Sequence, residues 1–542
     1  MSRLSLRAAG VLLVGALSLP STAAGADARF DVEAEPVWSV ADQTPIAPPA
    51  PSGWNEVASF VDAYWFYPLD DFFAMRRASP ALDVNALDEV PASSWFTPGK
   101  TGLPPWLAGS RSLAAPLSPI LAGRPPHSGP LAVLAARLEG ESPYLLVRDS
   151  LGVRFRLEFD APEAPELRTG AAVIAGRLLH AAGYHVLEST IATLQPARLV
   201  LAPEAAEIGR HGGRRALSAE RLDDFLARRP QATAALAPGA GEVRVAASRI
   251  PEGVILGGFS PRGRRADDPS DLIPHEARRS LRGLNPLAAW LDHAALQQDA
   301  TLDLYLQPDN YVRHCLTGLT LTLGNARNSA VDGAGRFYGL HAFHPRLLEP
   351  LTWRPELLFA PFAAMDWADA FWGVRLLLSF SDAEIASVVA AGRYSDPQVT
   401  EYVTGALQER RDRIGRAWLE RINAIDRFTV RQPAPGRWSL QGTDLGVLHG
   451  LRQPEDVYYL MTMRLPETGE TLGYQSRPGG QIEFDLTPFV PAAWSHRLDP
   501  GRYAIADITS WDHTGRSLTG TTRVHLYFDR ASGPRVAGII RD

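Results

Sequence analysis

The spacing of apolar residues changes twice along the chain, and these changes limit the fold more than any other feature. From residue 130 the segments PLAVLAARL, SPYLLVRD and VRFRLEFD read as strands, and a single helix is predicted over 165–184. From about 258 to 432 the pattern is mainly helical, with one candidate helix over 275–293 that is kinked or restarted at Pro286. From 435 onwards short alternating segments return at the spacing of a sandwich. The sequence therefore predicts an α+β fold with a C-terminal all-β, sandwich-like domain.

At 542 residues the chain exceeds the size at which one hydrophobic core stops growing, so several domains are expected. Proline-rich sequence before residue 56 should be extended and exposed, and a stretch dense in Pro and Gly at 95–130 should wrap over a core. The predicted division is a signal peptide at 1–26, a proline-rich spacer at 27–55, an N-terminal α+β lobe with its Pro/Gly-rich wrap at 56–257, a helical C-lobe at 258–432 and a β-sandwich domain at 435–542.

The N-terminus has the pattern of a secretory signal. Arg3 and Arg7 precede an apolar run at 8–19, and small residues follow up to a cleavage point between Ala24 and Ala28. The run is too short to span a bilayer, so we expect a periplasmic or extracellular protein with no transmembrane anchor after cleavage. Removal of the first 24 residues takes away two arginines and no acid, which changes the net charge from −6 to −8. This acidic balance argues against nucleic acid as a partner.

Familiar catalytic motifs fail when their spacing is tested. Lys100 is the only lysine among the 54 basic residues, but the first glycine of a phosphate-binding loop would fall at Ser94, and prolines replace the required helix. GFSPR at 258–262 lacks the second glycine of a nucleophile elbow, and AVDGAGR at 330–336 reads as a turn. Cys315 has no cysteine partner and is expected to be a small buried hydrophobe. We expect neither a metal nor a cofactor.

Five separated segments carry a resemblance to a known family. They are DEVPASSWFT (88–97), LEFDAPEAPELRTGAAVIAGRLLHAAGY (157–184), HEARRSLRGLNPLAAWLDH (275–293), VRHCLTGLTLTLG (312–324) and RRDRIGRAWL (410–419). In this order they resemble a family of uncharacterised bacterial proteins with a protein-kinase-like core, distantly similar to the spore-coat and toxin-type kinases. The resemblance covers about residues 56–430. It implies a two-lobed, kinase-like core, with a strand-rich N-lobe that holds one helix and a helical C-lobe.

The resemblance also implies where the phosphotransfer residues should lie, and all five positions differ. The strand lysine, the helix glutamate, the catalytic aspartate, the asparagine and the metal-binding aspartate fall at Glu158, Ala172, Ala295, Ala300 and Gly318. A carboxylate in place of the lysine turns attraction for each phosphate into repulsion of about 4 kcal/mol at 4 Å. The metal-binding oxygens are missing too. The resemblance therefore implies a degenerate, pseudokinase-like protein without catalytic residues.

Two other readings use neighbouring residues. Arg156 lies on the same strand face as Glu158 and could replace the lysine as a cation, with Asp292 and Asp299 flanking the catalytic segment, so a non-standard kinase is one alternative. The other is an enzyme of another class, with hydrolase-type acid and base chemistry. Its candidate groups are Glu158 with Asp160, or Asp292 and Asp299 with His293.

We expect the chain to act as a binding or scaffolding module rather than as an enzyme. Its C-terminal domain carries aromatic residues that form either a binding patch or the sandwich core. These are Trp438, Tyr458, Tyr459, Trp494 and Trp511. The expected partner is an unknown protein or a cell-envelope glycan.

Overall fold

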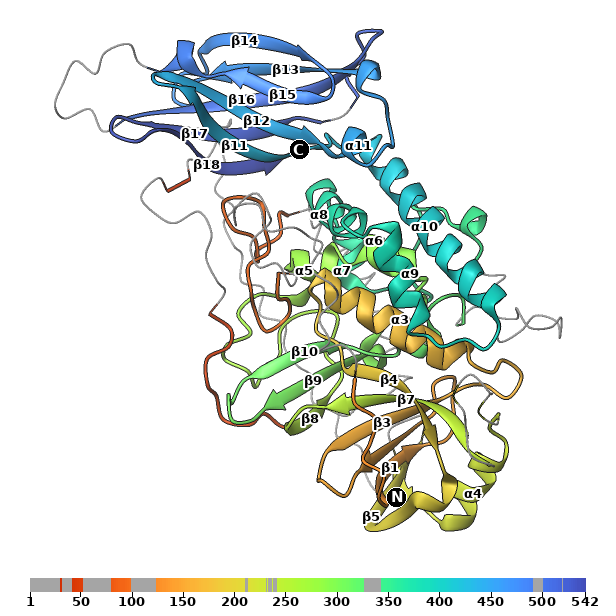
Figure 1. Cartoon of the computed structure of the whole chain (residues 1–542). Coiled ribbons are helices and arrows are strands. Elements are labelled where there is room, and N and C mark those ends of the chain that lie inside the picture. Colours follow the sequence, from red (N-terminus) through yellow and green to blue (C-terminus); the bar gives the residue numbers. More distant parts are fainter. Residues whose placement is uncertain are drawn as a thin grey trace, which may run out of the picture.

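The computed structural model describes residues 30–31, 41–51, 79–98, 123–209, 213–230, 232, 236, 241–325, 343–490, 501–518 and 520–542. The predicted signal peptide, Lys100, the turn at 330–336 and Trp494 lie outside these residues. Figure 1 shows a seven-stranded sheet at one end, helices in the middle, and two further sheets at the C-terminal end. The α+β composition and the C-terminal all-β region are as predicted.

The first sheet has the strand order β4-β7-β3-β2-β1-β5-β6. β1 and β5 run parallel, and the other neighbours run antiparallel. The strands are β1 (Leu131–Arg137), β2 (Tyr144–Arg148), β3 (Arg154–Phe159), β4 (Glu188–Leu194), β5 (Leu199–Ile208), β6 (Arg214–Ala216) and β7 (Val243–Ile250).

Two helices accompany this sheet, so the prediction of a single helix between residues 56 and 257 was wrong. α4 (Ala219–Ala227) begins at Ser218, whose side chain accepts a hydrogen bond from a backbone N–H of the first turn, and its apolar residues join the core of the sheet. α3 (Leu167–Ala182) packs into the core of the helical region instead. It ends at Gly183 with φ +112°, where a Cβ would lie 2.5 Å from the Thr97 carbonyl oxygen, so only glycine fits.

The middle of the chain contains a second small sheet among its helices. β8 (Gly253–Gly257), β9 (Thr301–Leu306) and β10 (Val312–Leu316) form it in the order β10-β9-β8. The helices are α5 (Arg279–Arg282), α6 (Asn285–Leu291), α7 (Ala360–Ala363), α8 (Trp367–Leu378), α9 (Asp382–Ala390) and α10 (Pro397–Leu419). The helix expected over 275–293, kinked or restarted at Pro286, is two short helices, and Pro286 stands in the first turn of the second one, α6.

Arg410 of α10 fixes the end of α6. Its buried guanidinium donates hydrogen bonds to the carbonyl oxygens of Trp290 at 2.9 Å and Ala289 at 2.6 Å. The last carbonyls of a helix have no partner within it, so this side chain supplies the missing donors. The segment from α6 to β9, which carries five of the predicted site residues, is therefore anchored at its start.

The C-terminal region is two antiparallel sheets around one hydrophobic core. Inward residues of β13 such as Tyr459, Met461 and Met463 alternate with outward ones. One sheet has the order β11-β12-β15 and the other β14-β13-β16-β17-β18. The elements are β11 (Ile425–Ala434), β12 (Arg437–Asp444), α11 (Leu445–Leu448), β13 (Val457–Arg464), β14 (Thr471–Pro478), β15 (Gln481–Asp485), β16 (Gly501–Asp512), β17 (Thr522–Asp529) and β18 (Gly533–Arg541).

A buried network of charges ties these sheets to the helices. Arg541 of β18 pairs with Asp88 and with Asp426 of β11, and its guanidinium lies 3.8 Å from the ring centre of Phe371 in α8. Arg279 of α5 also pairs with Asp88. The segment around Asp88 therefore lies between the helices and the C-terminal sheets.

Within the described residues, no helix is both long and apolar enough to cross a membrane. The described part of the proline-rich segment, residues 41–51, is mostly exposed, as predicted. It is nevertheless attached to the body of the protein, because the Asp42 carboxylate accepts two hydrogen bonds from Ser94 and the Ile46 backbone N–H donates to Asn310.

Candidate functional site

Glu158, at the expected lysine position, lies buried on β3 and is paired within its own strand. Its Oε1 is 3.0 Å from Nη2 of Arg156, which confirms that the two side chains share a face. The Arg156 guanidinium also lies 4.2 Å from the ring centre of Tyr144 on β2. The arginine that could have replaced the lysine is therefore already held by a carboxylate and an aromatic ring.

A second pair lies beside the first. Asp299, in the 3-10 turn η6 (Gln298–Ala300), is 3.5 Å from the guanidinium of Arg137 on β1. Burial raises the pKa of Asp299, and the charges of Arg137 and Arg156 oppose that rise. We refer to Arg137, Arg156, Glu158 and Asp299 as the charge cluster; its two cations and two carboxylates balance.

The positions expected to hold a metal are filled by backbone and a methyl group. Gly318 has φ +66°, and a Cβ there would lie 2.9 Å from Cβ and 3.2 Å from Cα of Ala300. The backbone N–H of Thr317 donates to the Ala300 carbonyl at 2.8 Å, which holds the two segments at this spacing. A side chain at 318 would require the backbone to move.

The turn between β1 and β2 is fastened over the same region. The hydroxyl groups of Ser142 and Thr320 are 2.8 Å apart, and Thr320 belongs to the 3-10 turn η7 (Leu319–Leu321). The Arg168 guanidinium of α3 donates to the carbonyl of Glu141 at 2.5 Å. These two side-chain contacts connect the turn to the segment after β10 and to the first turn of α3.

The remaining kinase-like positions are packed among apolar groups. Ala172 is buried in the core around α3, and Ala295 is half-buried beside Ala294 and Leu321. The neighbouring His293 is buried, and burial lowers its pKa to about 4. A neutral, enclosed imidazole at this place contributes packing rather than charge.

The carboxylates proposed for acid and base chemistry have separate partners. Asp292 ends α6 with φ +49°, and its Oδ1 accepts a hydrogen bond from the Trp353 indole at 3.1 Å. Asp160 accepts two hydrogen bonds from Thr169; burial raises its pKa, and Arg244 opposes the rise. Each carboxylate therefore has a local structural role, and the structure does not join them into an acid and base pair.

Other expectations can be placed on the described residues. No group of three or more His, Cys, Asp or Glu there is arranged to hold a metal ion. Cys315 is buried in a small apolar cluster, as predicted, and burial raises its pKa to about 12. Ser260 of the rejected elbow motif donates its hydroxyl to the Arg262 carbonyl within its own turn.

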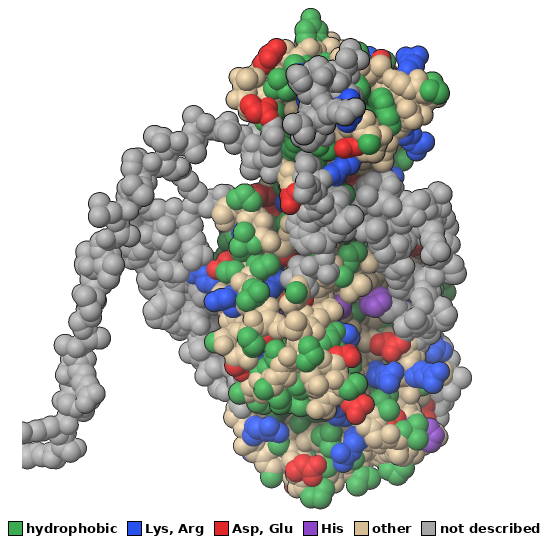
Figure 2. All heavy atoms as spheres, turned by 90° about the vertical axis from the view of Figure 1, so that its left-hand side faces the viewer, with side chains coloured by type: hydrophobic (Ala, Val, Ile, Leu, Met, Phe, Trp, Pro, Cys, Tyr) green, Lys and Arg blue, Asp and Glu red, His purple; other side chains and the backbone are tan. Residues whose placement is uncertain are grey.

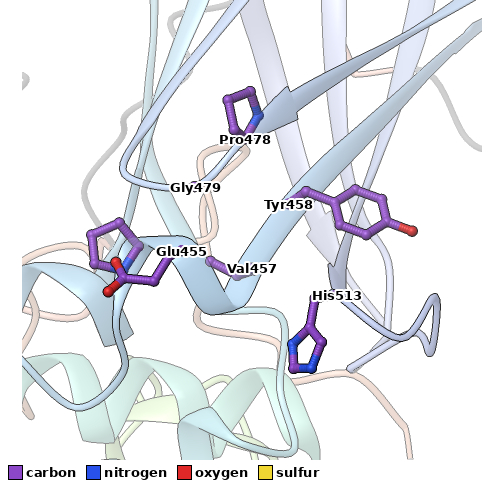
Figure 3. Close-up of a pocket in the computed structure, with 7 residues that line it drawn as sticks. Glu455, Val457, Tyr458, Pro478, Gly479 and His513 are labelled. Carbon is purple, nitrogen blue, oxygen red and sulfur yellow. The ribbon is translucent and has the colours of Figure 1, made fainter.

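The C-terminal sheets carry a cavity. Of its lining residues, only Tyr458 was singled out from the sequence. Its volume is about 360 Å³. Figure 3 shows its lining residues, which come from the turn before β13, the first two residues of β13, the end of β14 with the turn that follows it, and the residue after β16. They are Pro454, Glu455, Val457, Tyr458, Pro478, Gly479 and His513. In Figure 1 this part of the protein lies at the opposite end from β3 and the charge cluster.

The predicted aromatic residues divide between this surface and the core. Tyr459 is fully buried and donates its hydroxyl to Asp444, so it belongs to the core. Trp438 packs against the same core. Tyr458 and Trp511 are partly exposed cross-strand neighbours with nearly parallel rings, 6.4 Å apart at an angle of 17°. The sequence could locate Tyr458, but Glu455 and His513 carried no signal.

Comparison of the chain with protein-family models, with curated proteins and with solved structures finds no significant match in any of the three.

Proposed function

We propose that this chain is a kinase-like protein without phosphotransfer activity that acts as a binding or scaffolding module. Kinases place the phosphate-binding lysine on the third strand and its glutamate partner on the helix that follows. Glu158 lies on the third strand of the first sheet, and Ala172 lies on the next helix, α3. The order of these elements supports the kinase-like assignment of both positions.

The hairpin of β9 and β10 supports the assignment of the other positions. Ala300 immediately precedes β9, and Gly318 lies two residues after β10, so the antiparallel pairing brings them into contact. In a kinase, the residues at these positions would bind the metal ions together. Two non-polar residues meet here instead.

The charge cluster is the observation that carries the proposal. A nucleotide phosphate that approached Arg156 or Arg137 would also meet the carboxylate of Glu158 or Asp299. Each carboxylate would repel the phosphate by about 4 kcal/mol at 4 Å and an effective dielectric constant near 20, which offsets the attraction of its arginine. Without metal-binding oxygens at 300 and 318, no cation offsets the charge of a triphosphate.

A phosphotransfer assay tests this proposal. The full chain would be incubated with radiolabelled ATP, with Mg²⁺ or Mn²⁺, and with casein and myelin basic protein as general acceptors. We expect neither self-labelling nor acceptor labelling above a heat-denatured control. Labelling that disappears when Asp299 and Glu158 are replaced by Ala would instead establish a kinase with non-standard residues.

We do not propose hydrolase-type chemistry, since Asp160, Asp292 and Asp299 already have structural partners. Export through the N-terminal signal remains part of the proposal on sequence grounds. We therefore propose a secreted protein that binds a partner and catalyses no reaction.

A further inference from the structure

The cavity on the C-terminal sheets is built by a close approach of two turns. A Cβ on Gly479 would lie 1.8 Å from the carbonyl oxygen of Pro454 and 2.7 Å from that of Val457. Only glycine permits this distance, so the turn before β13 and the turn after β14 form a fixed wall. The volume of about 360 Å³ falls within the usual range for small-molecule sites, roughly 300–1,000 Å³.

One member of an aromatic pair on the outward face of the sheet, Tyr458, lines this cavity. Val457 and Tyr459 are buried, whereas Tyr458 between them faces outward and lines the cavity. Trp511 lies across from Tyr458, and its indole donates a hydrogen bond to Thr509 at 2.8 Å, which fixes the ring. Partly exposed, oriented aromatic rings outside the core are typical of binding surfaces.

The polar groups of the cavity restrict the ligand. Glu455 and His513 are exposed, and Figure 3 shows them on two sides of Val457. A carboxylate accepts hydrogen bonds from hydroxyl groups and repels phosphates and carboxylates, and an imidazole can donate or accept. The cavity therefore favours a neutral ligand that has several hydroxyl groups and one apolar face.

We propose that this cavity binds a neutral pyranose unit of a cell-envelope glycan, with the apolar face of the sugar on Tyr458 and its hydroxyl groups toward Glu455 and His513. This inference rests on the proposed function as a binding module and names its ligand class. The predicted export of the chain brings the cavity to the compartment in which such glycans lie. A protein partner is the competing outcome of the test.

Isothermal titration calorimetry with the full chain tests this inference. The probes are tetrasaccharides of glucose, of galactose and of N-acetylglucosamine. We expect at least one of them to bind with a Kd of about 10 µM to 1 mM. Tyr458→Ala should weaken that binding by about tenfold or more, because it removes the stacking surface.

Tyr474→Ala is the matched control. Tyr474 lies on β14 of the same sheet, is 77% exposed and does not line the cavity, so its loss should change the Kd less than about twofold. If Tyr458→Ala unfolds at a lower temperature than the wild type, Glu455→Gln and His513→Ala take its place, since both side chains are exposed.

Absence of binding to all three probes at about 10 mM overturns the inference. Equal losses in Tyr458→Ala and Tyr474→Ala overturn it too. Either result leaves the absence of phosphotransfer untouched, because that proposal depends on residues at the other end of the molecule (Figure 1). If the chain both bound a sugar and transferred phosphate, the inference of a glycan site would hold and the proposal that the chain lacks phosphotransfer activity would fail.

Discussion

At the scale of single residues, each of the five positions to which the resemblance assigns a phosphotransfer role is paired or packed against its neighbours. The resemblance located Glu158, Ala300 and Gly318, but it could not show what surrounds them. The pair of Arg137 with Asp299 joins two segments distant in sequence, so no local pattern announces it. Arg156 is different, because the two-residue period of a strand places it beside Glu158 from the sequence alone.

The contact between Gly318 and Ala300 gives the first prediction. Gly318→Ala should lower the free energy of unfolding by about 1–3 kcal/mol more than Gly152→Ala. Both glycines have positive φ, so both substitutions add similar backbone strain, but nothing lies within 4 Å of a Cβ at Gly152. Urea denaturation of the two variants measures the difference. Equal losses would mean that position 318 has room for a side chain.

Glu158→Lys restores the residue type of a kinase and gives the second prediction. We expect no gain of nucleotide binding, and a loss of about 2–4 kcal/mol in stability, because the new ammonium faces Arg156. Glu158→Gln, which removes the charge without reversing it, should lose less. Fluorescence titration with a labelled ATP and urea denaturation measure the two effects. A Kd for ATP below about 1 mM in Glu158→Lys would show that one residue had silenced an intact site.

One buried and two half-buried histidines give a pH dependence. Burial lowers the pKa of His185, His293 and His449 to about 4, while an unfolded histidine titrates near 6.5. Between these values the unfolded chain binds more protons, so stability falls as the pH drops from about 6.5 toward 4.

Replacing His293 by Leu should therefore reduce the loss of stability between pH 7 and pH 5 by about 1–2 kcal/mol. The comparison uses the difference between the two pH values, so a constant effect of the substitution on packing cancels. Urea denaturation at both pH values measures it. An unchanged difference would show that the pKa of His293 is the same in the folded and the unfolded protein.

At the scale of helices and strands, the periodic segments near the start of the described chain were predicted correctly, whereas two short strands within the expected helical region were missed. The strands at 131–137, 144–148 and 154–159 and the helix at 167–182 lie where the alternating and helical patterns put them. The region from 258 to 432 was expected to be mainly helical, yet it contains the β9 and β10 hairpin. TLDLYL does alternate, with Leu302, Leu304 and Leu306 between Thr301, Asp303 and Tyr305, so its strand pattern was present in the sequence and was overlooked.

Contacts between elements give the fourth prediction. Arg541→Met removes a buried cation that joins β18 to Asp88 and Asp426, and should cost about 3–5 kcal/mol. Arg523→Met on the neighbouring β17 breaks pairs that are partly exposed, and should cost less than about 1 kcal/mol. Urea denaturation compares the two. Similar small losses would mean that the buried network does not hold the C-terminal sheets.

At the scale of the whole molecule, the division into parts was easier to predict than their connection. The sequence indicated a separate β domain, and Figure 1 shows the C-terminal sheets set above the helices. Figure 2 shows the same elongated outline from the side, with acidic and basic side chains interspersed on the described surface of this face. The joining contacts are not local: Arg541 and Asp88 are 453 positions apart. No periodicity in the sequence connects such residues.

Calorimetric titration of the wild-type chain with ATP, in the presence of Mg²⁺ and then of Mn²⁺, tests the central claim most directly. If the arginines of the charge cluster are held by their own carboxylates, no saturable heat should appear up to about 5 mM ATP. Saturable binding below about 1 mM that depends on the metal and weakens on Arg156→Ala would contradict the account, because it would show a nucleotide at the site that the cluster is said to close.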